Sequence, residues 1–367
     1  MKFTTPAGDF LECLKSAHGR CKSSAVDILR HIRFDVDGQQ LTMTGHDMSA
    51  SCEAYLGVDD PEDGSCAVPG DAIVRLVGSL PKEAHLTIEL AGHQITVKSG
   101  KSRYKIPVLK SDDFPAALTC DSKASVELSA QDVETLFGRT RQALDQKDSR
   151  PFGQGLFLHM AEGGLCTSGI SLFHFARLKA TATLPELCGV IIPLAAVDEI
   201  AKVCKDGGHM TVSDRTIAVE ANGRRFCSKL IESEYPDYSR LLPQLVENYV
   251  DIDRAETLAA VRRLTSVAEP NSVIDLTIGD REIVLSMSGL PGEGIESVQC
   301  SSETKIENVL VSIAAQRFIE MLEMPTGEVL QLHFTKGSML VRIHDPSDPT
   351  FILVESTRIP KGYRAAA

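Results

Sequence analysis

The repeat on which this chain is built is set by a stretch that reads AVPGDAIVRLV at residues 67–77. It predicts a short apolar strand, a proline at which a helix can begin, and a helix with one apolar face. The same order of strand and helix recurs as VIIPLAAVDEI at 190–200 and as VLVSIAAQRFI at 309–319. The corresponding junction residues Val68, Ile192 and Val311 are 124 and 119 residues apart, and such near-equal steps indicate an internal repeat.

A second set of helices has the same spacing. Helical patterns at 9–18, 130–137 and 253–261 start 121 and 123 residues apart. Their apolar residues recur with the period of a helix, whereas alternating segments between them predict strands. The expected strands lie at 32–38, 40–44, 85–90, 94–98, 102–109, 155–159, 173–183, 210–212, 217–219, 273–278, 282–286, 330–334 and 339–343.

The repeat predicts three domains, at residues 1–123, 124–246 and 247–367. Each would be of the α+β class, with antiparallel sheets and two helices packed against one side. Three such domains in line would form an arc with the helices on its concave face. An exposed sheet edge on that arc would invite pairing with a second copy.

Composition limits the class of protein. The chain has 367 residues, and 43% of them are apolar, which allows a packed core throughout. It has no run of eighteen apolar residues and begins MKFT without an apolar leader, so we expect a cytoplasmic protein without membrane helices. Ten cysteines without a Cys-x-x-Cys pair are expected to be ordinary buried thiols. The net charge of −12 argues against a simple polyanion binder.

The motifs of common enzymes are absent from the sequence. It contains no glycine-rich phosphate loop, no Gly-x-Ser-x-Gly elbow and no His-Glu-x-x-His run. His46, His174 and His209 are isolated, and a lone histidine is more often a core residue than a ligand. We therefore expect a non-catalytic protein without a metal or cofactor.

Several short strings carry a resemblance to a known family. They are MKFT at 1–4, LTMTGHD at 41–47, SRY at 102–104, DFP at 113–115 and, most specifically, SKLIESEYPDYSRLLP at 228–243. With these strings and its length, the chain resembles the bacterial DNA polymerase III beta subunit, the replicative sliding clamp. The resemblance implies three clamp domains, a head-to-tail homodimer that forms a ring around duplex DNA, and no catalytic residues. It also implies that the ring tethers the polymerase III catalytic subunit and other proteins to DNA, and that a clamp loader opens it.

A ring that slides must contact phosphates without reading bases, which is the role of lysine and arginine. The formal charge of six candidate helices sums to zero, so the acidic excess lies elsewhere in the chain. The family often carries basic residues just after the proline of the strand–helix junction, whereas this chain has Gly70-Asp71 and Leu194-Ala195 there. DNA affinity could therefore be low or depend more strongly on salt. Any one of the candidate cations could instead be a solvated surface residue. The candidate DNA contacts are Arg20, Lys22, Arg139, Arg141, Lys147, Arg150, Phe152 and Lys202.

The resemblance also implies a pocket for partner peptides. Glu355 stands where the family has an apolar residue, and a carboxylate there would reduce the gain from burying apolar peptide anchors. We expect weak or altered binding of the usual clamp-binding peptides, although the pocket could also have drifted without loss of function. The matching residues are Thr167, Gly169, Leu172, Pro236, Arg240, Leu241, Leu353 and Glu355.

Two segments, at residues 102–109 and 295–301, align with the edge strands that join clamp subunits. Pairing is expected to stop at Pro107, which has no N–H to donate, and Lys105 would complement the charge of Glu296. The expected interface residues are Arg103, Tyr104, Lys105, Ile106, Val267, Glu296, Val298 and Cys300. The altered pocket and the missing basic residues leave alternatives open. The chain could be a clamp paralogue that serves a specialised replicon or repair system, or a clamp-like scaffold for other proteins.

Overall fold

The computed structural model divides into two compact units. Unit 1 comprises Met1–Val133 and Leu184–Ile231, and unit 2 comprises Glu134–Thr183 and Glu232–Ala367. Each unit is described by itself. The structure describes residues 1–21, 26–121, 124–144, 147–171, 174–185, 187–240, 242–243, 245, 249–267, 269, 272–279, 281–288, 292–301, 309–334 and 339–358.

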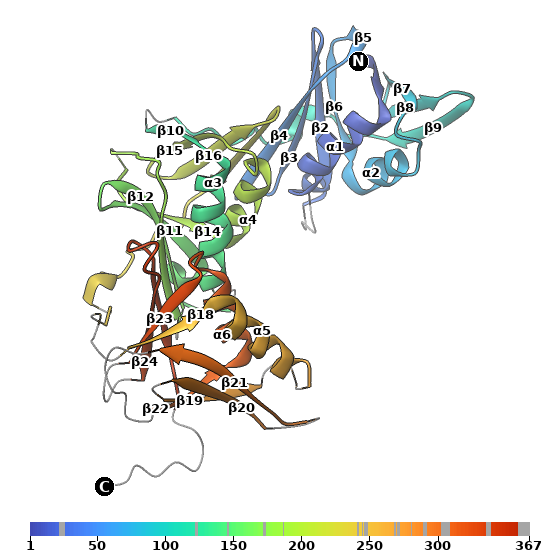
Figure 1. Cartoon of the computed structure of the whole chain (residues 1–367). Helices are drawn as coiled ribbons and strands as arrows, with labels where there is room; N and C mark the ends of the chain where they lie inside the picture. Colours follow the sequence, from blue (N-terminus) through green and yellow to red (C-terminus); the bar gives the residue numbers. More distant parts are fainter. Residues whose placement is uncertain are drawn as a thin grey trace. The chain divides into compact units, whose positions relative to one another are not determined.

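Unit 1 contains two antiparallel sheets and four α-helices in its described residues (Figure 1). The sheets have the strand orders β5-β1-β7-β8-β9 and β10-β15-β16-β17-β4-β3-β2-β6. The helices are α1 (Ala7–His18), α2 (Gly70–Gly78), α3 (Ala130–Val133) and α4 (Leu194–Val203). The strands are β1 (Lys2–Pro6), β2 (His31–Asp37), β3 (Gln40–His46), β4 (Ala50–Gly57), β5 (Asp59–Glu62), β6 (Gly64–Pro69), β7 (His85–Ala91), β8 (Gln94–Ser99), β9 (Ser102–Pro107), β10 (Ser125–Leu128), β14 (Val190–Pro193), β15 (Gly208–Val212), β16 (Thr216–Ala221) and β17 (Arg224–Lys229).

Unit 2 is dominated by one long antiparallel sheet. Its strands follow the order β11-β12-β13-β25-β24-β23-β18-β21-β20-β19-β22. The helical segments are η3 (Glu134–Arg139), η4 (Thr140–Ala143), η5 (Pro151–Gln154), η6 (Tyr238–Arg240), α5 (Arg254–Thr265) and α6 (Ala315–Glu323). The strands are β11 (Gly155–Ala161), β12 (Gly164–Ile170), β13 (His174–Lys179), β18 (Tyr249–Asp253), β19 (Val273–Ile278), β20 (Glu282–Met287), β21 (Gly294–Ser301), β22 (Val309–Ala314), β23 (Val329–Phe334), β24 (Leu340–His344) and β25 (Ile352–Ser356).

Both sheets that carry the candidate sites join strands from different repeats. In unit 1, β17 pairs antiparallel with β4, with Phe226 opposite Cys52. In unit 2, β13 pairs antiparallel with β25, with Phe175 opposite Val354. Backbone hydrogen bonding therefore continues across the expected domain boundaries, and each compact unit draws strands from two repeats.

The core of the first repeat follows from helical spacing. Phe10, Leu14 and Ala17 lie on one face of α1 and are fully buried. The ring of Phe10 packs edge-on against Phe3 and Phe34. Strand β3 approaches α1 so closely that a Cβ on Gly45 would lie 1.8 Å from the carbonyl oxygen of Ala17. The glycine of the LTMTGHD string is therefore a packing requirement.

The expected strand–helix junctions are present as β6–α2, β14–α4 and β22–α6. Pro69 and Pro193 stand directly before α2 and α4, where the missing proline N–H costs no helical hydrogen bond. The regular helix expected at 130–137 is wrong, because α3 covers one turn only and a π-helical segment, η3, follows it. The buried strand β12 was not predicted, because all its residues are buried and no alternation marks it.

Candidate functional site

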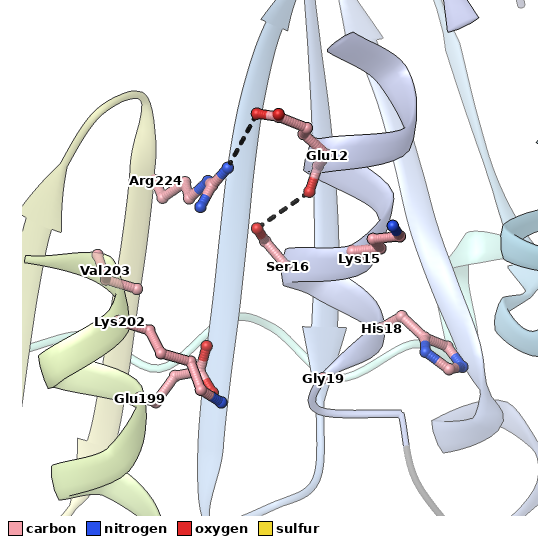
Figure 2. Close-up of a pocket in the computed structure, with 9 residues that line it drawn as sticks. All are labelled: Glu12, Lys15, Ser16, His18, Gly19, Glu199, Lys202, Val203 and Arg224. Atoms are coloured by element: carbon pink, nitrogen blue, oxygen red, sulfur yellow. Dashed lines mark hydrogen bonds and ion pairs between the residues drawn. The ribbon is translucent and has the colours of Figure 1, made fainter. Parts of the chain in front are cut away.

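A groove of about 460 Å³ lies between α1 and α4 in unit 1 (Figure 2). Lys15, Lys202 and Arg224 bring positive charge to it, and Glu12 and Glu199 bring negative charge. Arg224 Nη2 lies 3.6 Å from Glu12 Oε2, an ion pair drawn in Figure 2. Cations and carboxylates thus alternate over a surface that draws on two repeats.

Two of the predicted DNA contacts, Arg20 and Lys202, share one carboxylate, that of Glu199, which lines this groove together with Lys202. Arg20 Nη2 donates to Glu199 Oε2 at 3.4 Å, and Lys202 Nζ donates to the same oxygen at 3.5 Å. Arg20 Nη1 also donates to Asp47 Oδ2 at 3.5 Å. Its guanidinium lies over the ring of Phe226, with Cζ 5.7 Å from the ring centroid. Sequence reasoning missed Glu199, and its only signal was a position three residues before Lys202 on the expected helix.

The remaining predicted DNA contacts among the described residues belong to unit 2. Arg139 is half-buried, its Nε donates to the carbonyl oxygen of Met324 at 2.6 Å, and burial lowers its pKa. Arg150 donates to both carboxylate oxygens of Asp148, and this pairing raises the pKa of the arginine. Arg150 Cζ also lies 5.0 Å from the ring centroid of Phe152. Lys147 is exposed, and Lys22 lies outside the described residues.

Arg141 lines a second groove, of about 560 Å³, in unit 2. Arg317 and Arg358 add positive charge to this groove, and Glu320 and Glu355 add negative charge. Arg317 Nη1 donates to Glu320 Oε2 at 2.9 Å. As in unit 1, cations and carboxylates line the groove together.

The predicted peptide-pocket residues divide into buried and exposed members. Thr167 is fully buried and donates to the carbonyl oxygen of Leu136 at 2.9 Å. Leu353 belongs to the main core of unit 2. Pro236 is half-buried, while Arg240 is exposed and pairs with Asp237 at 3.1 Å. Leu172 and Leu241 lie outside the described residues, and Gly169 packs against Ala143 of η4.

Glu355 of the expected pocket is not an unpaired carboxylate. The register of β13 and β25 places it opposite His174, and Glu355 Oε2 lies 2.5 Å from His174 Nδ1. Both side chains are almost completely buried, with exposed fractions of 4% and 0%. His174 Nε2 is buried and has no hydrogen-bond partner among the described residues. The polar pair replaces the apolar contact that the resemblance implies.

An aromatic cluster lies beside the predicted pocket. The rings of Phe157 and Tyr235 stack with centroids 4.2 Å apart, and Phe157 also stacks on His159. His159 Nε2 lies 2.8 Å from the hydroxyl oxygen of Tyr238. Burial lowers the pKa of His159 to about 4, so the imidazole is neutral at physiological pH.

Of the two segments expected to join subunits, β9 lies at the edge of its sheet, whereas β21 lies between β18 and β20 in its sheet. Strand β9 ends its sheet and stops at Pro107, with Arg103, Tyr104 and Lys105 exposed. Ile106 is buried, so three of the four interface residues expected on this strand are exposed.

Strand β21 pairs with β20 along its length but with β18 only at Cys300 and Ser301. The edge of β21 before Cys300 is therefore unpaired among the described residues. Ile295 on this strand is 76% exposed, whereas Val298 is buried. Arg263 donates to both carboxylate oxygens of Glu296 at 2.8 Å, so the charge expected to attract Lys105 already has a partner. Val267 is exposed, and Cys300 Sγ lies 3.4 Å from the carbonyl oxygen of Gly279.

A metal-binding group of three or more histidine, cysteine or acidic residues is absent from the described part of the chain. Within the same residues, no helix combines the length and apolarity that crossing a membrane requires. The geometry offers charged grooves and sheet edges.

Comparisons with known proteins agree with this fold. Residues 1–119 match the family model of the DNA polymerase III beta subunit, N-terminal domain, and residues 127–237 match that of its central domain. The chain is 26% identical to the beta sliding clamp of Chlamydia pneumoniae over 344 residues, which cover 92% of this chain and 90% of the relative.

Solved structures show the same likeness. The crystal structure of the DNA polymerase III subunit beta from Pseudomonas aeruginosa superposes with a TM-score of 0.90 at 21% identity and covers 98% of this chain and 100% of the other. The C. crescentus beta sliding clamp with PEG bound to a putative beta-motif tethering region gives a TM-score of 0.90 at 20% identity, over 98% and 99% of the two chains.

Proposed function

The chain belongs to the DNA polymerase III beta subunit family, and we propose that it is a DNA sliding clamp. It would encircle duplex DNA without sequence specificity and hold a polymerase there as a processivity factor, without chemistry of its own. The observation that carries this proposal is the match of two successive family models, supported by a common fold over 98% of the chain.

We propose that two copies join head to tail into a ring of six domains, three from each chain at 1–123, 124–246 and 247–367. The free edge of β9 in one copy would pair with the free edge of β21 in the other. An unpaired strand edge is a ready template for another strand, and a head-to-tail contact that closes gives a ring. Tyr104 and Ile295 are the exposed side chains that such pairing would bury.

For DNA, we propose contacts by Arg20, Arg141, Lys147, Arg150 and Lys202, with Lys22 and Phe152 beside them. Phosphate contacts give affinity without sequence information. Several of these cations are already paired with carboxylates, which supports weak and exchangeable contacts. Arg139 is better explained as a structural residue, because its Nε donates a hydrogen bond to the carbonyl oxygen of Met324.

We propose the polymerase III catalytic subunit, a clamp loader and other carriers of clamp-binding peptides as protein partners, in the cytoplasm where the DNA lies. Their peptides would contact the predicted pocket at Pro236 and Arg240, together with Leu172 and Leu241, whereas the buried residues Thr167, Gly169, Leu353 and Glu355 would support the pocket from within. The beta-motif tethering region named for the C. crescentus clamp supports a binding surface of this kind.

A second candidate function is a clamp paralogue that serves one specialised replicon or repair system. The buried pair of His174 and Glu355 favours it, because a polar pair replaces an apolar residue of the expected peptide pocket. Fluorescence anisotropy with a standard clamp-binding peptide separates the two. Affinity as tight as that of ordinary clamps favours the housekeeping role, and weak affinity favours the paralogue.

The test of the clamp function is topological. The protein is loaded onto nicked circular plasmid by the clamp loader of the same genome, and the complex is isolated by gel filtration. A sliding ring stays on the circle and is lost when the plasmid is cut once with a restriction enzyme. Equal retention on circular and linear DNA, or a monomer at micromolar concentration in analytical ultracentrifugation, contradicts the proposal.

A further inference from the structure

Glu199 occupies an unusual position among the cations of the groove between α1 and α4. The residue is a carboxylate on α4 that is only 8% exposed. Its Oε2 accepts hydrogen bonds from both Arg20 and Lys202. One carboxylate thus neutralises two of the residues proposed to contact DNA.

Arg20 is restrained from a second side as well. Asp47 accepts from its Nη1, and the guanidinium plane packs over Phe226. The Nε of Arg20 is buried and has no hydrogen-bond partner among the described residues. The side chain is 15% exposed, so a phosphate that approached it would have to displace Glu199.

Two other pairs that involve groove residues differ from this one in the exposure of the acid. Arg224 pairs with Glu12 at 3.6 Å, and His18 Nε2 lies 2.8 Å from Asp71 Oδ1. These acids are exposed, with side-chain fractions of 77% and 81%, so water screens their pairs and they can yield to a phosphate. In contrast to these acids, Glu199 has a buried side chain, with an exposed fraction of 10%.

We propose that Glu199 restrains DNA binding by competing with backbone phosphates for Arg20 and Lys202. This inference rests on the proposed function, since it assigns a role within the DNA-binding surface of a clamp. A carboxylate close to two cations lowers the positive potential that a phosphate meets, and it holds Arg20 against Phe226. Contacts weakened in this way exchange readily, as sliding requires.

The contrary role for Glu199 is that of a positioning residue which aims Arg20 at DNA. The two roles predict opposite signs. If Glu199 restrains binding, Glu199→Gln strengthens binding to duplex; if it positions Arg20, the same substitution weakens binding. Glutamine keeps the size of the side chain and an oxygen that can accept one hydrogen bond.

The experiment measures the affinity of the full-length protein for a fluorescein-labelled duplex by fluorescence anisotropy between about 50 and 200 mM salt. We expect E199Q to bind more tightly than the unmodified protein. Each additional phosphate contact steepens the slope of log K against log salt by about 0.9, so the advantage at the lower salt is about threefold larger than at the higher. D206N is the matched control, because exposed Asp206 pairs with neighbouring exposed Lys205 at 3.8 Å and its substitution changes the net charge equally.

A second variant tests the same point from the cation. R20Q weakens duplex binding in both backgrounds, but it weakens binding more in the E199Q background, where Arg20 is freed from Glu199, and so it removes most of the gain from E199Q. Hydrogen exchange of α1 and α4 checks that the variants keep their fold.

Binding by E199Q that is equal to or weaker than that by D206N overturns the role of Glu199 while the clamp function stands. If the unmodified protein neither binds the duplex at low salt nor stays on nicked circular plasmid, the proposed function itself fails.

Discussion

Breaking the buried pair of His174 and Glu355 should destabilise unit 2 far more than removing both partners. The two atoms are 2.5 Å apart, and the side chains are 0% and 4% exposed. His174→Ala would leave a carboxylate buried without its partner, and removal of one member of a buried pair costs about 3–5 kcal/mol. Replacing both members with apolar residues, as in His174→Leu with Glu355→Met, is expected to be neutral or stabilising by about 1–4 kcal/mol.

The assay is urea unfolding of the full-length protein, followed by hydrogen exchange to assign the change to β13 and β25. Glu323→Met is the control, because Glu323 pairs with Arg262 at the surface and should contribute at most about 1 kcal/mol. The same double variant should bind a standard clamp-binding peptide more tightly, since it restores an apolar residue to the predicted pocket. A double variant as unstable as the worse single variant would refute the reasoning.

Three further predictions concern packing, pH and assembly. Gly45→Ala should lower the free energy of unfolding by more than about 3 kcal/mol, because the new Cβ would lie 1.8 Å from the carbonyl oxygen of Ala17. The control Gly57→Ala, where a Cβ would have nothing within 4 Å, should lower it little. Equal unfolding midpoints of the two variants would contradict this. The pKa of His159 falls from 6.5 to about 4 on folding, so its contribution to the free energy of unfolding is full above pH 6.5 and is lost as pH falls toward 4, by at most about 3 kcal/mol. His159→Phe should flatten that part of the stability profile. An unchanged profile would contradict the lowered pKa of His159. Ile295→Asp should raise the dimer dissociation constant at least about tenfold in analytical ultracentrifugation. Ile295 is 76% exposed at the free edge of β21, so an aspartate there would bring a charge into the proposed interface. An unaltered dissociation constant would place the interface elsewhere.

Sequence periodicity predicted the repeated helices and most strands because those elements have one buried and one exposed face. It failed where that contrast is missing. Strand β12 is buried throughout and so lacks the alternation that marks a strand. The helix after Ser129 carries helical periodicity, but α3 gives way to the π-helical residues of η3, which no local pattern distinguishes from an α-helix.

The candidate sites were predictable as residue types but not as partnerships. Glu355 was recognised as an acid at an apolar position, yet its partner His174 lies 181 residues earlier in the chain. Glu199 lies 179 residues after Arg20 and becomes relevant only when α1 and α4 are placed together. Ion pairs over such separations depend on sheet register, which single-sequence patterns do not contain.

The pairing of β17 with β4 and of β13 with β25 bears on how this gene can be divided. A fragment that ended at residue 123 would keep β4 paired with β3 but would lose β17, leaving unpaired peptide groups along residues 50–54 of β4. Such a fragment would be prone to aggregate or to capture a strand from another molecule. Expression of a soluble piece therefore calls for cuts that respect the shared sheets, and insertion of a tag or a foreign domain belongs in surface turns, away from the junctions between repeats.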